Sequence, residues 1–285
     1  MVGRLFRARL RYQTMTPELD LDAYFERIGW NGATSPGLDT LAGLIRAHMA
    51  AIPFENLDVL LGRPVRLDIG GLQAKLVAAR RGGYCFEQST LFAAVLERLG
   101  FHPVRHSARV TMMTPRTAST RSHMFLTVPL HEGRFVVDVG FGSLAAAFPV
   151  PLLDGEQSRA GEATHWMARE GNFWLLRARS DEKTIDAWAS TLEQDYPIDF
   201  EMANHYIATH PASPFVNRIL MRALTKNGRV TVMNRDVTIW RDGVPHASQL
   251  ADRADLRALL AEHFGFDLPE VERIRIPAIA EWAGS

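Results

Sequence analysis

The chain has one cysteine in 285 residues, and it stands where a nucleophilic thiol would be useful. Cys85 follows the pair Gly82-Gly83 and precedes an apolar pattern with helical spacing over residues 91–99. The thiol is therefore expected on or beside the first turn of a helix, where backbone N–H groups and the helix dipole favour an anion. A lone cysteine is often an ordinary buried apolar residue. The glycine pair favours the nucleophile, because it allows a tight turn just ahead of the thiol.

A nucleophilic cysteine needs a base and a group that holds the base. Among the ten histidines His123 is the best placed, because it opens a strand pattern after a polar loop. The next strand pattern carries Asp138 as a single carboxylate among valines. A buried carboxylate needs a partner, so we expect Asp138 to accept a hydrogen bond from His123 on the neighbouring strand.

The spacing of this hairpin predicts that His123 and Asp138 lie near each other, but it leaves open whether their side chains are in contact. A two-residue turn at Glu132-Gly133 would place Asp138 opposite Thr127, on the same face as His123 but four residues away, roughly 13 Å at the usual rise of a strand. A bulge, strong coiling or a bend would have to shorten that gap.

The surrounding patterns divide the chain into three predicted domains. Residues 1–100 read as a helical bundle that carries Cys85, residues 101–193 as a twisted sheet closing toward a β-barrel that carries His123 and Asp138, and residues 194–285 as a mixed α/β segment. Helices are expected at 21–30, 38–52, 72–80, 200–209 and 249–264, with one after Cys85. Strands are expected at 104–112, 124–130, 135–139, 165–168, 173–178, 218–224, 229–233 and 238–240.

Composition excludes several classes of protein. The 32 basic and 32 acidic residues leave no broad positive surface for nucleic acid. No apolar run is long enough to cross a bilayer, and no signal peptide is recognisable. One cysteine cannot form an internal disulfide, so a reducing cytoplasm is the expected compartment.

Five stretches, in order along the chain, resemble the arylamine N-acetyltransferases. The first three are Arg-Gly-Gly-Tyr-Cys-Phe-Glu-Gln at 81–88, His123 at the head of a short apolar strand, and Val-Asp-Val-Gly-Phe-Gly at 137–142. Two more are Ile-Pro-Phe-Glu-Asn-Leu at 52–57, and the segment 199–206 followed by Ser-Pro-Phe-Val at 213–216. The likeness runs from about Leu21 to the C-terminal helix, and five ordered motifs are more specific than any one of them.

The resemblance implies an α+β fold of three domains: an N-terminal helical bundle, a central β-barrel and a C-terminal α/β lid, with a papain-like Cys-His-Asp triad. It implies ping-pong transfer of an acetyl group from acetyl-CoA to an arylamine, arylhydrazine or N-hydroxyarylamine, as in xenobiotic metabolism, without a metal. Ser122 and Gly142 resemble family positions that contact the cofactor. Thr225, in the stretch Thr-Lys-Asn-Gly at 225–228, is a separate candidate for a contact with its phosphates. The aromatic side chains that match the family's acceptor pocket are Phe54, Phe141 and Phe215.

The expected partners are acetyl-CoA and a small aromatic amine or hydrazine, with neither nucleic acid nor membrane, in a monomer or homodimer. The tetrahedral oxyanion is expected to meet backbone N–H groups of Cys85 and of a loop before Arg109. None of the other histidines has the spacing of a metal site.

Two other functions remain open at this point. A papain-like or transglutaminase-like enzyme could use the same triad on a peptide, although such enzymes often carry a pro-segment or are secreted. A binding module could keep the fold without activity, and slow labelling by a thiol-reactive probe would identify it.

Two local features complete the expectations. Arg80-Arg81 reads as a solvated helix end that complements the dipole. Residues 1–14 carry four arginines ahead of the family-like sequence, and we expect this arm to be dispensable. Ser89 stands where the family is expected to carry asparagine.

Overall fold

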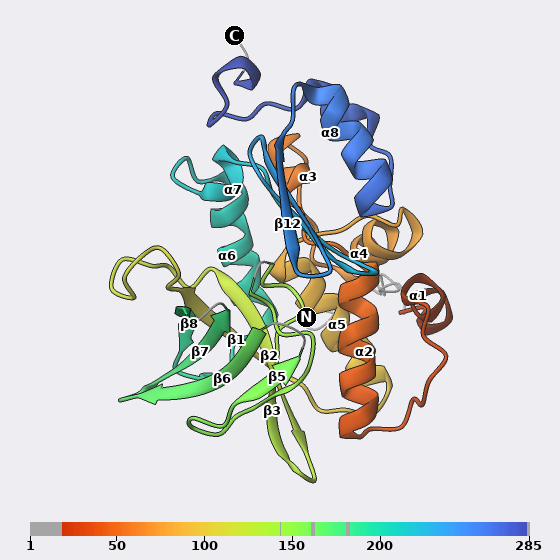
Figure 1. Ribbon diagram of the computed structural model, residues 1–285. Helices are drawn as coiled ribbons and strands as arrows, with labels where there is room; N and C mark the ends of the chain where they lie inside the picture. Colours follow the sequence, from red (N-terminus) through yellow and green to blue (C-terminus); the bar gives the residue numbers. More distant parts are fainter. Residues whose placement is uncertain (1–18, 143, 161–162, 181–182, 284–285) are drawn as a thin grey trace, which may run out of the picture.

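The computed structural model describes residues 19–142, 144–160, 163–180 and 183–283, and the basic arm at residues 1–14 lies outside these ranges. Figure 1 shows helices α1 and α2 on one side of the molecule and the strands β1 to β8 on the other. The smaller sheet that ends in β12 lies beside them, with helix α8 next to it.

The N-terminal part consists of helices whose ends follow local sequence signals. Asp20 caps α1 by accepting a hydrogen bond from Ala23 N, and Gly29 ends that helix in the left-handed region at φ 65°. The predicted helix at 72–80 is instead an α-helical turn continued by a π-helical segment, Gln73–Ala78. The helices are α1 (Leu21–Ile28), α2 (Leu38–Ala51), α3 (Leu57–Leu60), α4 (Ile69–Leu72) and α5 (Cys85–Arg98).

The central part is one antiparallel sheet of eight strands in the order β4-β3-β2-β1-β8-β7-β6-β5. The sheet curls so far that β4 also lies against β6, which makes a nearly closed barrel. Strands β4, β5 and β8 were not expected from the sequence. The strands are β1 (Val104–Val110), β2 (His123–Leu130), β3 (Gly133–Val137), β4 (Val150–Pro151), β5 (Ser158–Ala160), β6 (Ala163–Glu170), β7 (Phe173–Ser180) and β8 (Lys183–Ser190).

The predicted register of the β2–β3 hairpin is wrong by two residues. Leu130 pairs with Gly133, so the turn is His131-Glu132 rather than Glu132-Gly133. Leu126 pairs with Val137, and the same register continued by one residue brings Asp138 level with Phe125. The acid therefore lies two positions from His123 instead of four, and the gap needs no bulge in this hairpin to close.

The C-terminal part forms a second antiparallel sheet covered by helical segments. The predicted closing helix at 249–264 is wrong at its start, because Gln249 ends β12 and the helix begins at Arg253, where Asp252 caps it. A π-helical segment, Leu260–Phe264, continues it. The elements are α6 (Pro197–Thr209), α7 (Pro214–Asn217), β9 (Leu220–Thr225), β10 (Gly228–Met233), β11 (Asp236–Arg241), β12 (Val244–Gln249) and α8 (Arg253–Leu259).

Apolar packing and backbone pairing join the three parts. Phe200 and Ile207 of α6 pack in the core of the helical part, whereas Leu57 and Leu60 of α3 pack in the core of the C-terminal part. Phe54 forms two backbone hydrogen bonds with Arg222 of β9. None of the helices within the described ranges is long and apolar enough to span a membrane.

Candidate active site

Cys85 is the first residue of α5, as the sequence predicted, and only 4% of it is exposed. Its backbone N–H is among those that a helix leaves without an intrahelical partner. Space rather than positive φ restricts the two preceding glycines, most severely at Gly82, where the contact is with backbone. A Cβ on Gly82 would lie 2.1 Å from Pro53 O, and one on Gly83 would lie 2.6 Å from Glu87 Oε2.

The segment that carries the acid also passes very close to the nucleophile. A Cβ on Gly140 would lie 2.6 Å from Cys85 Cα, which is closer than real Cβ atoms approach. Glycine is therefore required at this position for the two backbones to meet.

His123 and Asp138 form a buried pair, with Nε2 of the imidazole 2.8 Å from Oδ2 of the carboxylate. Each residue is 2% exposed. Cys85 is a further neighbour that acts on the charge of His123, and since Nε2 is engaged with Asp138, Nδ1 is the ring nitrogen left to face the thiol. Burial by itself lowers the pKa of His123, but the charge and hydrogen bond of Asp138, with those of Cys85, raise it to about 10. The imidazole is therefore protonated at neutral pH.

Trp188 is a neighbour of the acid that the sequence did not reveal. Its Nε1 donates to Asp138 Oδ2 at 2.8 Å, and its ring stacks on Phe125 with centroids 4.2 Å apart. The other oxygen, Oδ1, is buried without a hydrogen-bond partner among the described residues. The only signal in the sequence was a short apolar stretch after a polar segment, and it did not predict strand β8.

A buried network of charged side chains supports the turn that carries Cys85. Arg81 donates to Glu55 and Asp58, both at 2.6 Å, while Lys75 lies 2.8 Å from Asp58 and 2.7 Å from Glu87. Glu87 in turn accepts the backbone N–H of Tyr84 at 3.1 Å. The expectation that Arg80-Arg81 is a solvated helix end is therefore wrong for Arg81, which is buried and paired.

The ionisation of these groups reflects both their burial and their charged neighbours. Burial raises the pKa of Glu87 to about 7, with Lys75 opposing the shift and Glu55 adding to it. Burial lowers the pKa of Arg81, yet Glu55 and Asp58 raise it overall. The network thus keeps Lys75 and Arg81 charged next to the turn that carries Cys85.

A second set of hydrogen bonds holds the same turn from the side of α2. Gln88 Nε2 donates to Gly83 O at 2.7 Å and to Pro53 O at 3.2 Å, and its Oε1 lies 3.3 Å from His48 Nε2. His48 Nδ1 lies 2.8 Å from the hydroxyl of Tyr24. A neutral His48 with its proton on Nε2 satisfies both contacts. Burial accordingly lowers the pKa of His48 to about 3, with Gln88 opposing the shift.

The three predicted acceptor-pocket rings do not form one cluster. Phe54 and Phe215 pack edge to face with centroids 6.2 Å apart, and Phe215 also lies 5.1 Å from the ring of Tyr84. Phe141 instead packs against the imidazole of His123 at 4.8 Å. All three are half-buried.

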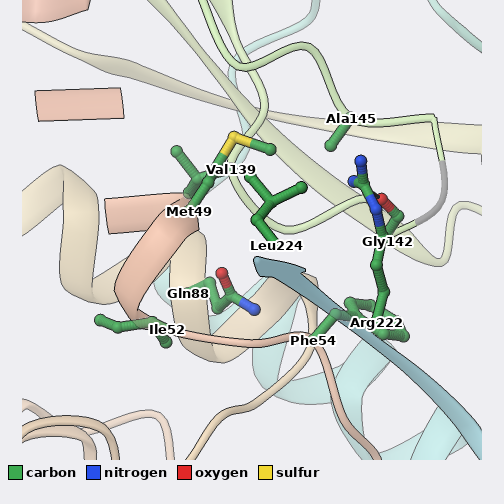
Figure 2. Close-up of a pocket in the computed structure, with 9 residues that line it drawn as sticks. All are labelled: Met49, Ile52, Phe54, Gln88, Val139, Gly142, Ala145, Arg222 and Leu224. Carbon is green, nitrogen blue, oxygen red and sulfur yellow. Dashed lines mark hydrogen bonds between the residues drawn. The ribbon is translucent and has the colours of Figure 1, made fainter. Parts of the chain in front are cut away.

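The residues predicted to contact the cofactor come from three different segments of the chain. Ser122 O accepts a hydrogen bond from Cys85 Sγ at 3.8 Å. Gly142 is in the left-handed region at φ 82°, and its carbonyl accepts a hydrogen bond from Arg222 Nη1. Thr225 ends β9 and follows Leu224, which lines a small cavity together with Gly142 and Phe54 (Figure 2).

The second backbone N–H that was expected to meet the oxyanion, in a loop before Arg109, does not lie in a loop. Arg109 lies inside β1 and pairs with Ala189 of β8, while Ala108 pairs with His123 of β2. No metal site accompanies the thiol, since no group of three or more His, Cys, Asp or Glu side chains in the described ranges could hold an ion.

Comparisons with known proteins agree on one family. A family model described as N-acetyltransferase matches residues 37–273. The arylamine N-acetyltransferase of Escherichia coli K12 is 36% identical over 262 residues, which cover 90% of this chain and 92% of that protein. The enzyme of the same name from Mycolicibacterium smegmatis is 36% identical over 258 residues, covering 89% of this chain and 94% of that protein.

Solved structures of the same family share the fold. The structure of Mycobacterium marinum arylamine N-acetyltransferase in complex with CoA superposes with a TM-score of 0.84 at 33% identity, covering 88% of this chain and 94% of that one. The enzyme from M. tuberculosis gives a TM-score of 0.84 at 36% identity, covering 88% of this chain and 96% of that one.

Proposed function

This chain belongs to the arylamine N-acetyltransferase family, and we propose that Cys85, His123 and Asp138 are its catalytic triad. The protein transfers an acetyl group from acetyl-CoA to an arylamine, arylhydrazine or N-hydroxyarylamine. The observation that carries the triad is the unbroken line of contacts from the Cys85 thiol through His123 to Asp138. Family membership also sets aside the peptide-directed alternative.

In the first half-reaction the Cys85 thiolate attacks the thioester carbonyl of acetyl-CoA, with His123 present as imidazolium. The S–C bond to Cys85 forms, and the charge on the carbonyl oxygen is met by the N–H of Cys85 at the start of α5. When the intermediate collapses, the bond to the CoA sulfur breaks and His123 Nδ1 gives its proton to that sulfur. CoA leaves, and an acetyl-cysteine and a neutral imidazole remain.

In the second half-reaction the nitrogen of the acceptor, or the oxygen of an N-hydroxyarylamine, attacks the acetyl-cysteine. His123 Nδ1 takes the proton of that nucleophile, and collapse of the second intermediate expels the Cys85 thiolate. Asp138 holds His123 with Nδ1 toward the thiol throughout. Because CoA leaves before the acceptor reacts, the kinetics are ping-pong.

Ser122, Gly142 and Thr225 are proposed to contact CoA, and Phe54, Phe141 and Phe215 the acceptor. Support comes from the position of Ser122 against the thiol, from the packing of Phe54 on Phe215, and from the contact of Phe141 with His123. The domain boundaries 1–100, 101–193 and 194–285, the cytoplasmic compartment, and a monomer or homodimer stay predictions from the sequence.

Incubation with acetyl-CoA followed by intact-mass measurement tests this function. The whole chain should gain one acetyl group, lose it on addition of an aromatic amine, and gain none in Cys85→Ala. Persistence of the adduct in Cys85→Ala, or kinetics that require both substrates bound together, would contradict the scheme.

A further inference from the structure

Arg222 is a half-buried cation that has no acidic partner among the described residues. Its Nη1 donates to the carbonyl of Gly142, whereas its Nε is buried and has no hydrogen-bond partner in the described part of the chain. No carboxylate among the described residues lies within ion-pair distance of it. Arg81, by contrast, is buried between Glu55 and Asp58.

The surroundings of Arg222 disfavour its charge and yet leave it charged. Burial lowers its pKa to about 10, and the neighbouring cation Arg229 adds to the shift. At neutral pH the guanidinium therefore stays ionised in a place that offers it no counter-charge. A charge that is partly withdrawn from water without a partner is costly, and an anion bound beside the buried Nε recovers part of that cost.

Arg222 lies on the acceptor side of the site. Its backbone N–H and carbonyl pair with those of Phe54 at 2.9 and 2.8 Å, and residues directly opposite in an antiparallel pair direct their side chains to the same face. Figure 2 shows the guanidinium beside Gly142. Gly142 directly follows Phe141, whose ring contacts His123. Arg222 thus lies between the proposed acceptor ring of Phe54 and the segment 141–142, whose Phe141 contacts His123.

The free space next to Arg222 limits what can reach it. The cavity that it lines has a volume of about 20 Å³, and most of its other lining is apolar. That volume admits one water-sized group. The tip of a carboxylate fits there, while an aromatic ring must remain outside it, among the larger side chains.

We propose that Arg222 binds the carboxylate of an acidic aromatic amine, such as an aminobenzoate, and so makes this enzyme selective for carboxylated acceptors. The inference rests on the proposed function, because the amine must at the same time reach acetylated Cys85. Arg222 Nε donates to the carboxylate, while Nη1 keeps its bond to Gly142.

The test compares 4-aminobenzoate with 4-aminobenzamide, two acceptors that differ in charge. Their kcat/KM values are measured with the wild type, Arg222→Met and Arg222→Lys. Arg222→Met should lower the benzoate-to-benzamide ratio about tenfold or more, as expected for loss of a charged hydrogen bond. Arg222→Lys keeps the charge and should restore part of the ratio.

The matched control is Arg229→Met, which removes a cation of the neighbouring strand that stacks on Trp240. Its ratio should stay within about twofold of the wild type. An Arg222→Met ratio equal to that of the wild type would overturn the proposal, leaving a buried water as the partner of Nε. Equal loss for both acceptors would do the same, because it would show that Arg222 only supports Gly142.

Two further measurements test whether Arg222 binds a phosphate of CoA instead of the acceptor, and whether the proposed function itself fails. The single-turnover rate of Cys85 acetylation is measured with acetyl-CoA and with S-acetyl-pantetheine, which lacks the CoA phosphates. A loss in Arg222→Met confined to acetyl-CoA would assign Arg222 to a phosphate and overturn the proposal. Failure of the wild type to acetylate Cys85 with acetyl-CoA would instead refute the proposed function.

Discussion

Trp188 donates its indole N–H to Asp138 Oδ2, the same oxygen that His123 Nε2 contacts. One carboxylate oxygen therefore serves two donors from two different strands, while the other has no partner among the described residues. The indole fixes the plane of the carboxylate, and so the direction in which His123 points.

Replacing Trp188 with phenylalanine should keep the stack on Phe125 and remove the donor. We expect a loss of about 1–3 kcal/mol in the free energy of unfolding, since a buried acceptor loses a partner. The acetylation rate should fall as well, because His123 is held less firmly. Denaturant unfolding and single-turnover acetylation measure the two effects. Trp166→Phe on β6 is the control, and equal effects of the two substitutions would show that the bond to Asp138 has no special role.

The raised pKa of His123 predicts a fast-reacting thiol at neutral pH. With a pKa of about 10 the imidazole is cationic at pH 7, and a cation beside a cysteine favours its reactive form. In His123→Gln the rate of iodoacetamide labelling at pH 7 should fall about tenfold or more. His131→Gln, in the exposed hairpin turn, should label like the wild type. Unchanged labelling in His123→Gln would mean that His123 is not the partner of the thiol.

Phe215 should distinguish aromatic from aliphatic acceptors. An aromatic pair adds roughly 0.5–1.5 kcal/mol beyond the area it buries, so Phe215→Ala should lower kcat/KM for aniline about 2- to 10-fold more than for a small alkyl hydrazine. The acetylation half-reaction should change less. Phe173→Ala, outside this ring cluster, is the control.

The same comparison applies to Phe141→Ala, with one difference. Because Phe141 packs on His123, some loss with every acceptor is expected as well. Equal losses for aniline and the hydrazine in both variants would place the two rings in the core or in the path of CoA.

His48 should make the fold sensitive to acid. Its pKa is about 3 in the folded chain and about 6.5 in an unfolded one, so only the unfolded chain takes up this proton as the pH falls from about 6.5 toward 3. Stability that is present above pH 6.5 is lost over that range, by about 2 kcal/mol between pH 7.5 and pH 5. Unfolding at both pH values should show a smaller loss in His48→Gln than in His131→Gln. Equal losses would mean that His48 is not held neutral.

The sequence was informative wherever a local pattern decides the structure. The helix that begins at Cys85 and the strand that begins at His123 follow from apolar periodicity and from the glycines before Cys85. The family and the nearly closed antiparallel sheet are confirmed as well. The catalytic roles of the site residues stay predictions.

What the sequence could not supply depends on residues far apart in the chain. The predicted register of the hairpin was wrong because Gly133, at φ 144°, pairs as a strand residue instead of forming the turn. Arg81 was expected in solvent, since nothing near it in the sequence shows that Glu55 and Asp58 meet it. Trp188 lies 50 residues from the carboxylate it contacts. Periodicity carries no information on such pairings.

The contact of Gly140 with Cys85 has a consequence for how this enzyme can diverge. Two backbones meet there with no side chain between them, so atomic radii alone determine their separation. Even a single methyl group at position 140 would force these two backbones apart, and so move Cys85 relative to the segment that carries Asp138.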